Sequence, residues 1–217
     1  MSKKFLILLF LIPFQLMFAQ KSLLKDFPEG YTPKEIGKRI AYRFLTEKHA
    51  LHVGKWIGYP ETFYWSGALR YADGAKDKEL IQRLQEKFDF LFTEEKILQP
   101  IMNHVDLNMF GSLPLEFYLV TKDLKYRYLG LPYADSQWEL PRNAKPHEKE
   151  WAEKGYSWQT RLWIDDMYMI TIVQSEAYKA TGDPKYINRA AKEMVLYLDE
   201  LQHPNGLFYH APDVPYY

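Results

Sequence analysis

Apolar residues recur every three or four positions along most of the chain, which is the pattern of amphipathic helices. The predicted helical stretches are 33–45, 63–72, 80–92, 109–120, 167–178 and 187–201. No stretch shows sustained two-residue alternation bounded by hairpin turns, so β-structure should be minor. The pattern therefore predicts an all-α fold.

The start of the first predicted helix carries three agreeing signals. Thr32 is a residue type that caps helices, Pro33 occupies the first helical position, and Glu35 completes a capping box with Thr32. We therefore expect a helix to begin at Pro33.

One junction between helices is repeated. Residues 118–126 (YLVTKDLKY) match residues 178–186 (YKATGDPKY) in register, and residues 70–77 form a looser third copy. Gly182 can adopt the left-handed conformation that ends a helix, and Asp183 can cap the next one. Each copy therefore predicts two antiparallel helices across a short turn. Repeated helical hairpins either stack into a superhelix or close into a ring.

A long connection separates two of the predicted helices. Residues 130–159 are rich in Pro, Trp and charge, and within them 145–154 resembles a solvated charged loop. A loop this long is either functional or a surface insertion. In a helical toroid it would help to build a cleft, whereas a helical repeat without a cleft would be a peptide-binding scaffold.

The N-terminus has the organisation of a secretory signal. Residues 1–4 are basic, residues 5–19 are almost wholly apolar, and Ala19 stands at a plausible cleavage point. The apolar run contains Pro13 and Gln15 and is too short for a membrane span. The alternative is a buried N-terminal helix. We expect residues 1–19 to be a signal peptide and the protein to be exported, either periplasmic or secreted.

The remainder, residues 20–217, is predicted to be one domain. Lys and Arg together number 28, as do Asp and Glu, and two of the lysines lie in the predicted signal. This leaves 26 basic against 28 acidic residues, a net charge of −2, which argues against nucleic-acid binding. The absence of Cys excludes disulfides, thiolate sites and lipid attachment through Cys, so no membrane association is expected after signal removal.

The densest group of chemically active side chains is the motif WIDDMYM at residues 163–169. Asp165 and Asp166 at a helix start are typical of capping and of dipole stabilisation. Capping requires only one of them, and it does not require Trp163 or Tyr168 nearby. Because an indole face stacks on sugar rings and a carboxylate beside it can donate a proton, the motif also suits a sugar enzyme.

Two further segments hold candidate residues. Asp106 precedes an apolar helix, so simple N-capping competes with a catalytic role, and His104 beside it lacks a third ligand for a metal site. His210 lies among aromatic residues in the segment 206–213, where a hydrogen-bonded structural role is the alternative. The chain lacks a nucleophile elbow, a phosphate loop, a dinucleotide fingerprint and an HExxH motif.

These motifs in combination resemble glycoside hydrolase families 88 and 105, the unsaturated glucuronyl and rhamnogalacturonyl hydrolases. The resemblance runs from about Tyr31 to the C-terminus. The matching segments are VDLNMFG at 105–111, WIDDMYM at 163–169, AYKATGDPKY at 177–186 and GLFYHA at 206–211.

The resemblance implies an (α/α)6 barrel and removal of a terminal 4,5-unsaturated uronic acid from oligosaccharides made by polysaccharide lyases. It implies that Asp165 is the proton donor and Asp106 the second active-site aspartate. Trp163 and His210 would contact the substrate, together with an aromatic residue that either Tyr64 or Trp65 supplies. It implies no metal and no organic cofactor.

The resemblance also implies a longer chain. A twelve-helix ring needs about twice as many helices as the periodicity shows, so we expect this sequence to be the N-terminal part of the barrel. Two other functions stay open: a different carbohydrate-active enzyme on an α/α toroid, and a helical scaffold that binds glycans without catalysis.

Overall fold

The structure is a computed structural model that describes residues 26–212. The predicted signal peptide lies outside the described residues. The helices are α1 (Pro33–Thr46), α2 (Tyr59–Ala75), α3 (Lys78–Asp89), α4 (Val105–Asn108), α5 (Ser112–Thr121), α6 (Leu124–Ser136), α7 (Pro146–Glu153), α8 (Ile164–Thr181) and α9 (Pro184–Leu201). Three single 3-10 turns, η1 (Phe90–Phe92), η2 (Lys96–Leu98) and η3 (Met109–Gly111), complete the helical part.

β-structure is minor, as predicted. Strand β1 (Leu51–His52) pairs antiparallel with β2 (Trp56–Ile57) in a two-residue hairpin. Within the described part of the chain, no helix has the length and the apolar run needed to cross a bilayer.

The described residues fall into two units, one that ends at Ile36 and one that begins at Gly37. In the first unit the predicted capping box is present. The Thr32 amide donates to Glu35 Oε2 at 3.0 Å, and the Glu35 amide donates to Thr32 Oγ1 at 3.2 Å. Helix α1 begins at Pro33, as expected from the sequence.

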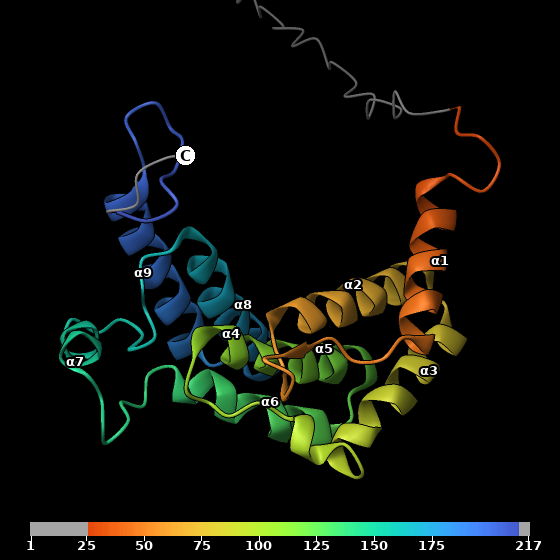
Figure 1. Cartoon of the computed structure of the whole chain (residues 1–217), viewed down its shortest axis with the longest axis horizontal. Helices are drawn as coiled ribbons and strands as arrows, with labels where there is room; N and C mark the ends of the chain where they lie inside the picture. Colours follow the sequence, from red (N-terminus) through yellow and green to blue (C-terminus); the bar gives the residue numbers. More distant parts are fainter. Residues whose placement is uncertain (1–25, 213–217) are drawn as a thin grey trace, which may run out of the picture. The chain divides into compact units, whose positions relative to one another are not determined.

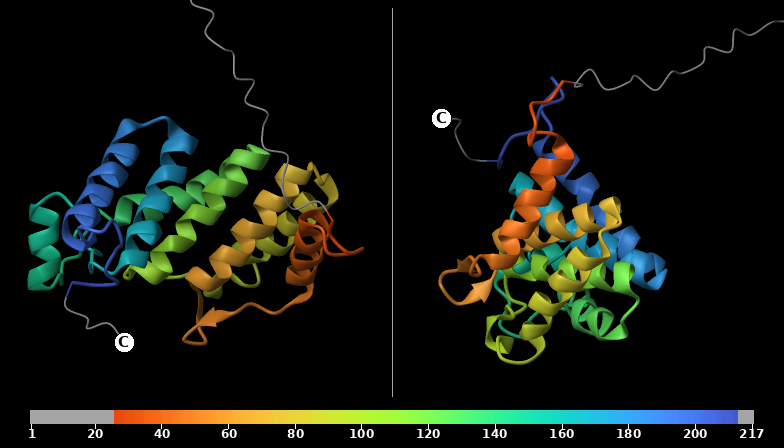
Figure 2. Two further views of the ribbon diagram at one scale, coloured as in Figure 1. Left: turned by 90° about the horizontal axis from the view of Figure 1, so that it is seen from above. Right: turned by 90° about the vertical axis from the view of Figure 1, so that its right-hand side faces the viewer.

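The second unit consists mainly of three consecutive helical hairpins, α2–α3, α5–α6 and α8–α9 (Figures 1 and 2). Helix α5 packs against both α2 and α8. The side chains show that α2 and α8 run in the same direction, since Phe63 early in α2 stacks on Tyr168 early in α8, and Arg70 late in α2 pairs with Glu176 late in α8. The helical class is confirmed, and the described residues do not show the closure of a ring.

The three hairpin turns share one construction. The second helix of each hairpin is capped by an aspartate, and the residue before that aspartate has a positive φ. These two residues are Lys76 and Asp77 in the first turn, Lys122 and Asp123 in the second, and Gly182 and Asp183 in the third. In the second and third turns a threonine, Thr121 or Thr181, also accepts from the amide of the capping aspartate. The repeated junction in the sequence is therefore a repeated structure.

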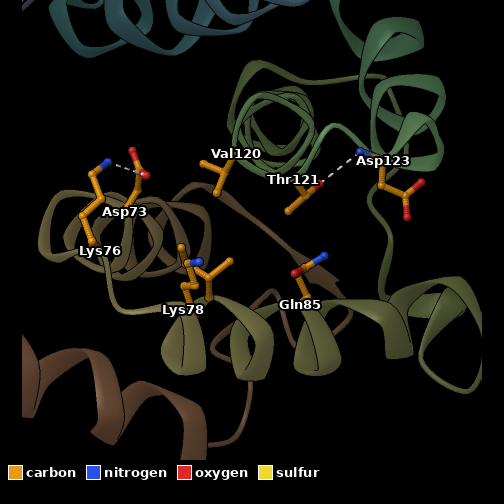
Figure 3. A pocket seen from close by; sticks show the side chains of 8 residues that line it. Asp73, Lys76, Lys78, Gln85, Val120, Thr121 and Asp123 are labelled. Atoms are coloured by element: carbon orange, nitrogen blue, oxygen red, sulfur yellow. Dashed lines mark hydrogen bonds and ion pairs between the residues drawn. The ribbon is translucent and has the colours of Figure 1, made fainter.

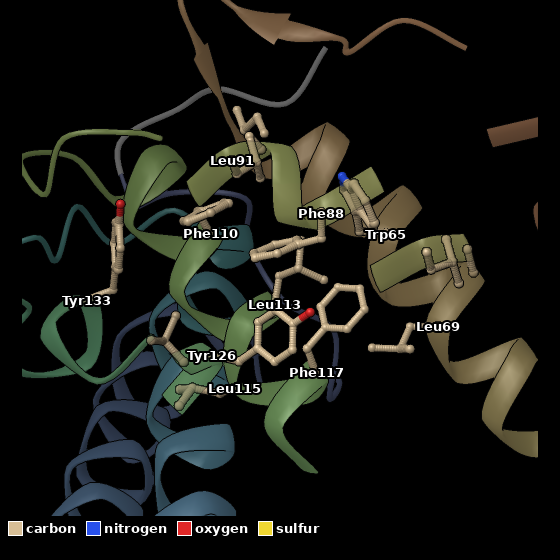
Figure 4. Close-up of a cluster of buried hydrophobic side chains, with 14 of the residues drawn as sticks. Trp65, Leu69, Phe88, Leu91, Phe110, Leu113, Leu115, Phe117, Tyr126 and Tyr133 are labelled. Carbon is tan, nitrogen blue, oxygen red and sulfur yellow. The ribbon is translucent and has the colours of Figure 1, made fainter. Parts of the chain in front are cut away.

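The second unit has an aromatic core between α2, α3, α5 and α6 (Figure 4). Trp65 meets Phe88 and Phe117 edge to face, with ring centroids 5.5 and 5.8 Å apart. Tyr126 stacks on Phe117 at 5.2 Å, and its hydroxyl donates to Asp89 at 2.7 Å. Each of these rings is fully buried or nearly so, so much of the high aromatic content is core.

The long connection predicted at 130–159 is only partly irregular. Helix α6 continues through Pro132 to Ser136. Proline removes the amide that would bond to the carbonyl of Tyr128. The predicted charged loop at 145–154 is instead helix α7, since Glu148 accepts from the Lys145 amide at 2.7 Å and completes an N-terminal cap.

The hairpin α5–α6 depends on a close backbone approach at Gly130. A Cβ there would lie 2.6 Å from Leu115 Cγ and 2.9 Å from the Gly111 carbonyl oxygen. We expect Gly130→Ala to lower the free energy of unfolding by about 1–3 kcal/mol through overpacking. Gly67 in α2 has open space around it, so Gly67→Ala should raise that free energy by up to about 1 kcal/mol. Urea unfolding of both variants checks the prediction, and an equal change in both would contradict it.

Candidate active site

The site residues gather around the guanidinium of Arg161, which precedes α8. Its Nε donates to Asp166 Oδ2 at 2.8 Å and its Nη2 to Asp166 Oδ1 at 2.6 Å. The same Nη2 also donates to Asp106 Oδ1 at 3.1 Å. One arginine from the segment before α8 therefore joins a carboxylate of α4 to a carboxylate of α8.

Asp166 is the buried member of this group, with no exposed surface. Burial raises its pKa above the ordinary value, and the Arg161 guanidinium opposes that rise. In return, the hydrogen bonds to Asp166 raise the pKa of Arg161. Because both oxygens of Asp166 accept from Arg161, this carboxylate is occupied within the protein.

Asp165, the predicted proton donor, is the exposed carboxylate of the pair. It lies in the first turn of α8, and it makes no hydrogen bond or ion pair with any residue between 26 and 212. Its carboxylate is therefore open to a ligand at both oxygens, whereas Arg161 donates to both oxygens of Asp166 and to one of Asp106.

Trp163 and His210 lie together, although 47 positions of sequence separate them. Their ring centroids are 5.4 Å apart with an interplanar angle of 53°. The Ile164 amide donates to the His210 carbonyl at 2.9 Å, so the segment after α9 is attached to the start of α8. The Arg161 guanidinium lies 5.1 Å from the Trp163 ring centroid, which places a cation over the indole.

Asp106 does not cap α4, and neither Asp165 nor Asp166 caps α8. His104 is the N-cap of α4, because its Nδ1 accepts from the Asp106 amide at 3.2 Å, whereas the Asp106 side chain binds Arg161. The N-cap of α8 is Trp163, which makes no side-chain cap. Simple capping by Asp106 is therefore wrong, because Asp106 binds Arg161 together with Asp166.

The prediction of Trp65 as an aromatic of the cleft is not compatible with its position, because its side chain is fully buried in the core. Tyr64 is 57% exposed, but its ring stacks on Phe44 of α1. The aromatics of α2 that lie toward α8 are Tyr59, which packs on the small cluster around Met169, and Phe63, which stacks on Tyr168 at 5.6 Å.

Sequence reasoning missed Arg161, Tyr59 and Phe63. The spacing offered a signal for the two aromatics, since Tyr59 and Phe63 are four residues apart and share one helix face. Arg161 had only a weak signal, a lone cation between the Trp-rich segment and the two aspartates. Its role follows from contacts across 55 residues of sequence.

The segment that carries Arg161 is attached to α9 through Glu193. This carboxylate has no exposed surface, accepts from the Ser157 amide at 3.1 Å, and accepts from the Thr160 hydroxyl. Burial raises the pKa of Glu193 to about 7, against 4.5 for the free side chain. The protonated form is therefore favoured in the folded protein below about pH 7.

This raised pKa predicts a pH-dependent stability. The stabilising contribution of protonated Glu193 is fully present below pH 4.5, the ordinary pKa, and is lost as the pH rises through about 7. We expect Glu193→Gln, which is neutral at every pH, to gain up to about 3 kcal/mol over the wild type between pH 5 and pH 8. Unfolding free energies across that range check this, with Glu200→Gln on the exposed face of α9 as control. Parallel profiles for wild type and Glu193→Gln would contradict it.

A hollow of about 520 Å³ lies between the turns of the first two hairpins (Figure 3). Its lining residues are Asp73, Lys76, Lys78, Ile81, Gln85, Val120, Thr121 and Asp123. None of the predicted site residues belongs to it. Among residues 26–212, no three His, Asp or Glu side chains converge in a way that would hold a metal ion.

Residues 33–217 match the model of Glycosyl Hydrolase Family 88. The chain belongs to this family. The matched residues include Arg161 and the three residues that its guanidinium contacts, His104, Asp106 and Asp166. They also include Trp163, Asp165 and His210. No curated protein and no solved structure matches the family 88 chain significantly.

Proposed function

We propose that this family 88 protein removes a terminal 4,5-unsaturated uronic acid from oligosaccharides produced by polysaccharide lyases. Membership of the family supports the class, glycoside hydrolase. The observation that carries the proposal is the contrast between Asp165, exposed and without a partner in the described chain, and the two aspartates held by Arg161.

That contrast supports Asp165 as the proton donor. A general acid must be able to reach the substrate and to exchange its proton. Asp166 is buried and both its oxygens accept from Arg161, and Asp106 accepts from the same guanidinium. Asp165 is the carboxyl group of the site that meets the requirement.

The substrate class suits a single acid group. An unsaturated uronide is a vinyl ether, so Asp165 delivers a proton to C4, and positive charge develops at C5 and the ring oxygen. The carboxylate of Asp165 then takes a proton from water as that water adds at C5. The resulting hemiketal opens and releases the rest of the oligosaccharide. One group acts first as acid and then as base, without a second carboxylate as nucleophile.

The other residues bind the sugar. The exposed indole of Trp163, 44% accessible, offers a face for a sugar ring, and His210 lies against it. Asp106 keeps one oxygen free of Arg161 for a sugar hydroxyl. The proposal includes an (α/α)6 barrel for the family domain, export of the protein, and no cofactor.

The experiment is an assay of the full chain on lyase-generated oligosaccharides. The absorbance of the unsaturated uronate should disappear, whereas saturated oligosaccharides of the same composition should stay intact. Cleavage of internal bonds with the absorbance retained would favour another sugar enzyme. Binding of the unsaturated oligosaccharides without turnover would overturn the catalytic proposal and favour a glycan-binding scaffold.

A further inference from the structure

We propose that Arg161 is a positioning residue, which acts on the substrate through Asp106 and does not contact the substrate itself. This inference rests on the proposed function for its consequence in turnover. Its structural part is the effect of Arg161 on the orientation of Asp106 and on the pKa of His104, and this effect can be measured without turnover.

The contacts of the guanidinium carry the inference. Nε and Nη2 donate to Asp166, Nη2 also donates to Asp106, and Nη1 lies 3.2 Å from His104 Nε2. Three of the five N–H groups of the guanidinium therefore donate to carboxylates, and Nη1 faces the imidazole of His104. An arginine engaged in this way has little capacity left for a substrate carboxylate.

Asp166 explains why the guanidinium stays in place. The pair is bidentate, with two N–H groups donating to the two oxygens of one buried carboxylate. Asp106, in contrast, receives one hydrogen bond from Arg161 at 3.1 Å. Asp166 is thus the anchor of the arginine, and Asp106 is the group that the arginine orients.

The backbone next to Arg161 supports the same interpretation. Leu162 has a φ of +58°, a left-handed conformation that residues with a Cβ rarely adopt. This residue lies between Arg161 and Trp163, whose side chains meet as a cation over a ring. A strained residue is retained where the surrounding contacts require its conformation, and here it brings the guanidinium and the indole together.

The charge of Arg161 also affects the pKa of His104. Burial is the largest cause that lowers its pKa, Asp106 acts to raise it, and Arg161 lowers it further. The titratable groups that face this cluster are Asp106, Asp165, Asp166, His52, Glu193 and Tyr197. Removal of the guanidinium leaves the Asp106 carboxylate without its cation, so the pKa of His104 should rise.

The test uses the full chain with Arg161→Gln combined with Asp166→Asn, because the second change avoids an unpaired buried charge. Arg161→Lys is the conservative variant, with the charge retained and the bidentate geometry lost. Arg189→Gln is the matched control, since Arg189 also lies 5.1 Å from a Trp ring, that of Trp138, and pairs with an aspartate, Asp135.

The first measurement is the titration of His104 by NMR, with its signal assigned by His104→Gln. We expect the pKa of His104 to rise in the Arg161→Gln/Asp166→Asn protein, to shift less in Arg161→Lys, and to stay unchanged in Arg189→Gln. Asp166→Asn alone keeps the cation and removes an anion that acts to raise the pKa of His104, so it should lower that pKa. Equal His104 pKa values in Asp166→Asn and in the folded double variant would overturn the inference.

The second measurement is a double-mutant cycle on turnover, with Asp106→Asn as the other change. If Arg161 acts through Asp106, its removal lowers kcat/KM about 10²-fold in the wild type but far less in Asp106→Asn. Equal losses in both backgrounds would show that Arg161 does not act through Asp106. A wild-type protein without turnover, but with the expected His104 shift, would contradict the proposed function and leave the structural part of the inference standing.

Discussion

We expect Asp165→Asn to lower kcat/KM on unsaturated oligosaccharides by about 10³-fold, within the range that general acid catalysis supplies. An amide cannot transfer a proton to C4, and it cannot take one from the water that adds at C5. Because Asp165 is exposed and has no partner in the described chain, the substitution should change the free energy of unfolding by no more than about 0.5 kcal/mol. Steady-state kinetics and urea unfolding of the same preparation test both statements.

Asp166→Asn, at the adjacent position, should affect stability more and turnover less than Asp165→Asn. Its carboxylate is buried and accepts two hydrogen bonds from Arg161, so an amide in its place loses one acceptor oxygen and the negative charge. The stability of the protein should fall, and the fall in turnover should be smaller than for Asp165→Asn. If Asp165→Asn keeps the wild-type rate while Asp166→Asn loses it, the donor is Asp166 and the proposed assignment is wrong.

The helices and their turns could be predicted from the sequence because local chemistry determines them. The capping box of Thr32 and Glu35 depends on residues three positions apart. The turns at Asp123 and Asp183 have the same hydrogen bonds because they have the same residues in register. Repetition of a local motif therefore predicted repetition of the hairpin.

The continuation of α6 through Pro132 could not be predicted in the same way. A proline inside a helical pattern usually ends the helix at the preceding residue. Here the end of α6 is secured by a distant residue, since the Trp158 indole donates to the Ser136 carbonyl at 2.7 Å. That contact joins positions 22 residues apart and has no local signal in the sequence.

The candidate site, like the fold, could be predicted from the sequence only in part. Trp163, Asp165 and His210 could be named from motifs and the family resemblance, but the contact between Trp163 and His210 could not, and the distinction between Asp165 and Asp166 depends on Arg161. Adjacent residues on a helix point about 100° apart, so one neighbour lies in the core and the other at the surface. The structure, not the sequence, identifies Asp166 as the buried one.

The same 100° rotation separates Tyr64 from Trp65 and yields the second large effect. Trp65 is fully buried between Phe44, Phe88 and Phe117, with centroids 4.9 to 5.8 Å away (Figure 4). We expect Trp65→Ala to lower the free energy of unfolding by about 3–5 kcal/mol, since it removes the largest side chain of the core and leaves a cavity. Thermal and urea unfolding measure this change.

Tyr64→Ala is the matched control for Trp65→Ala. Its side chain is 57% exposed and stacks on one ring, that of Phe44, so its loss should cost no more than about 1 kcal/mol. Trp65→Phe separates the two properties of the indole. It keeps an aromatic ring in the core and removes Nε1, a buried donor that finds no acceptor among residues 26–212, so it should destabilise far less than Trp65→Ala. If Tyr64→Ala proves as costly as Trp65→Ala, Tyr64 rather than Trp65 occupies the core, and the orientation of α2 described above is wrong.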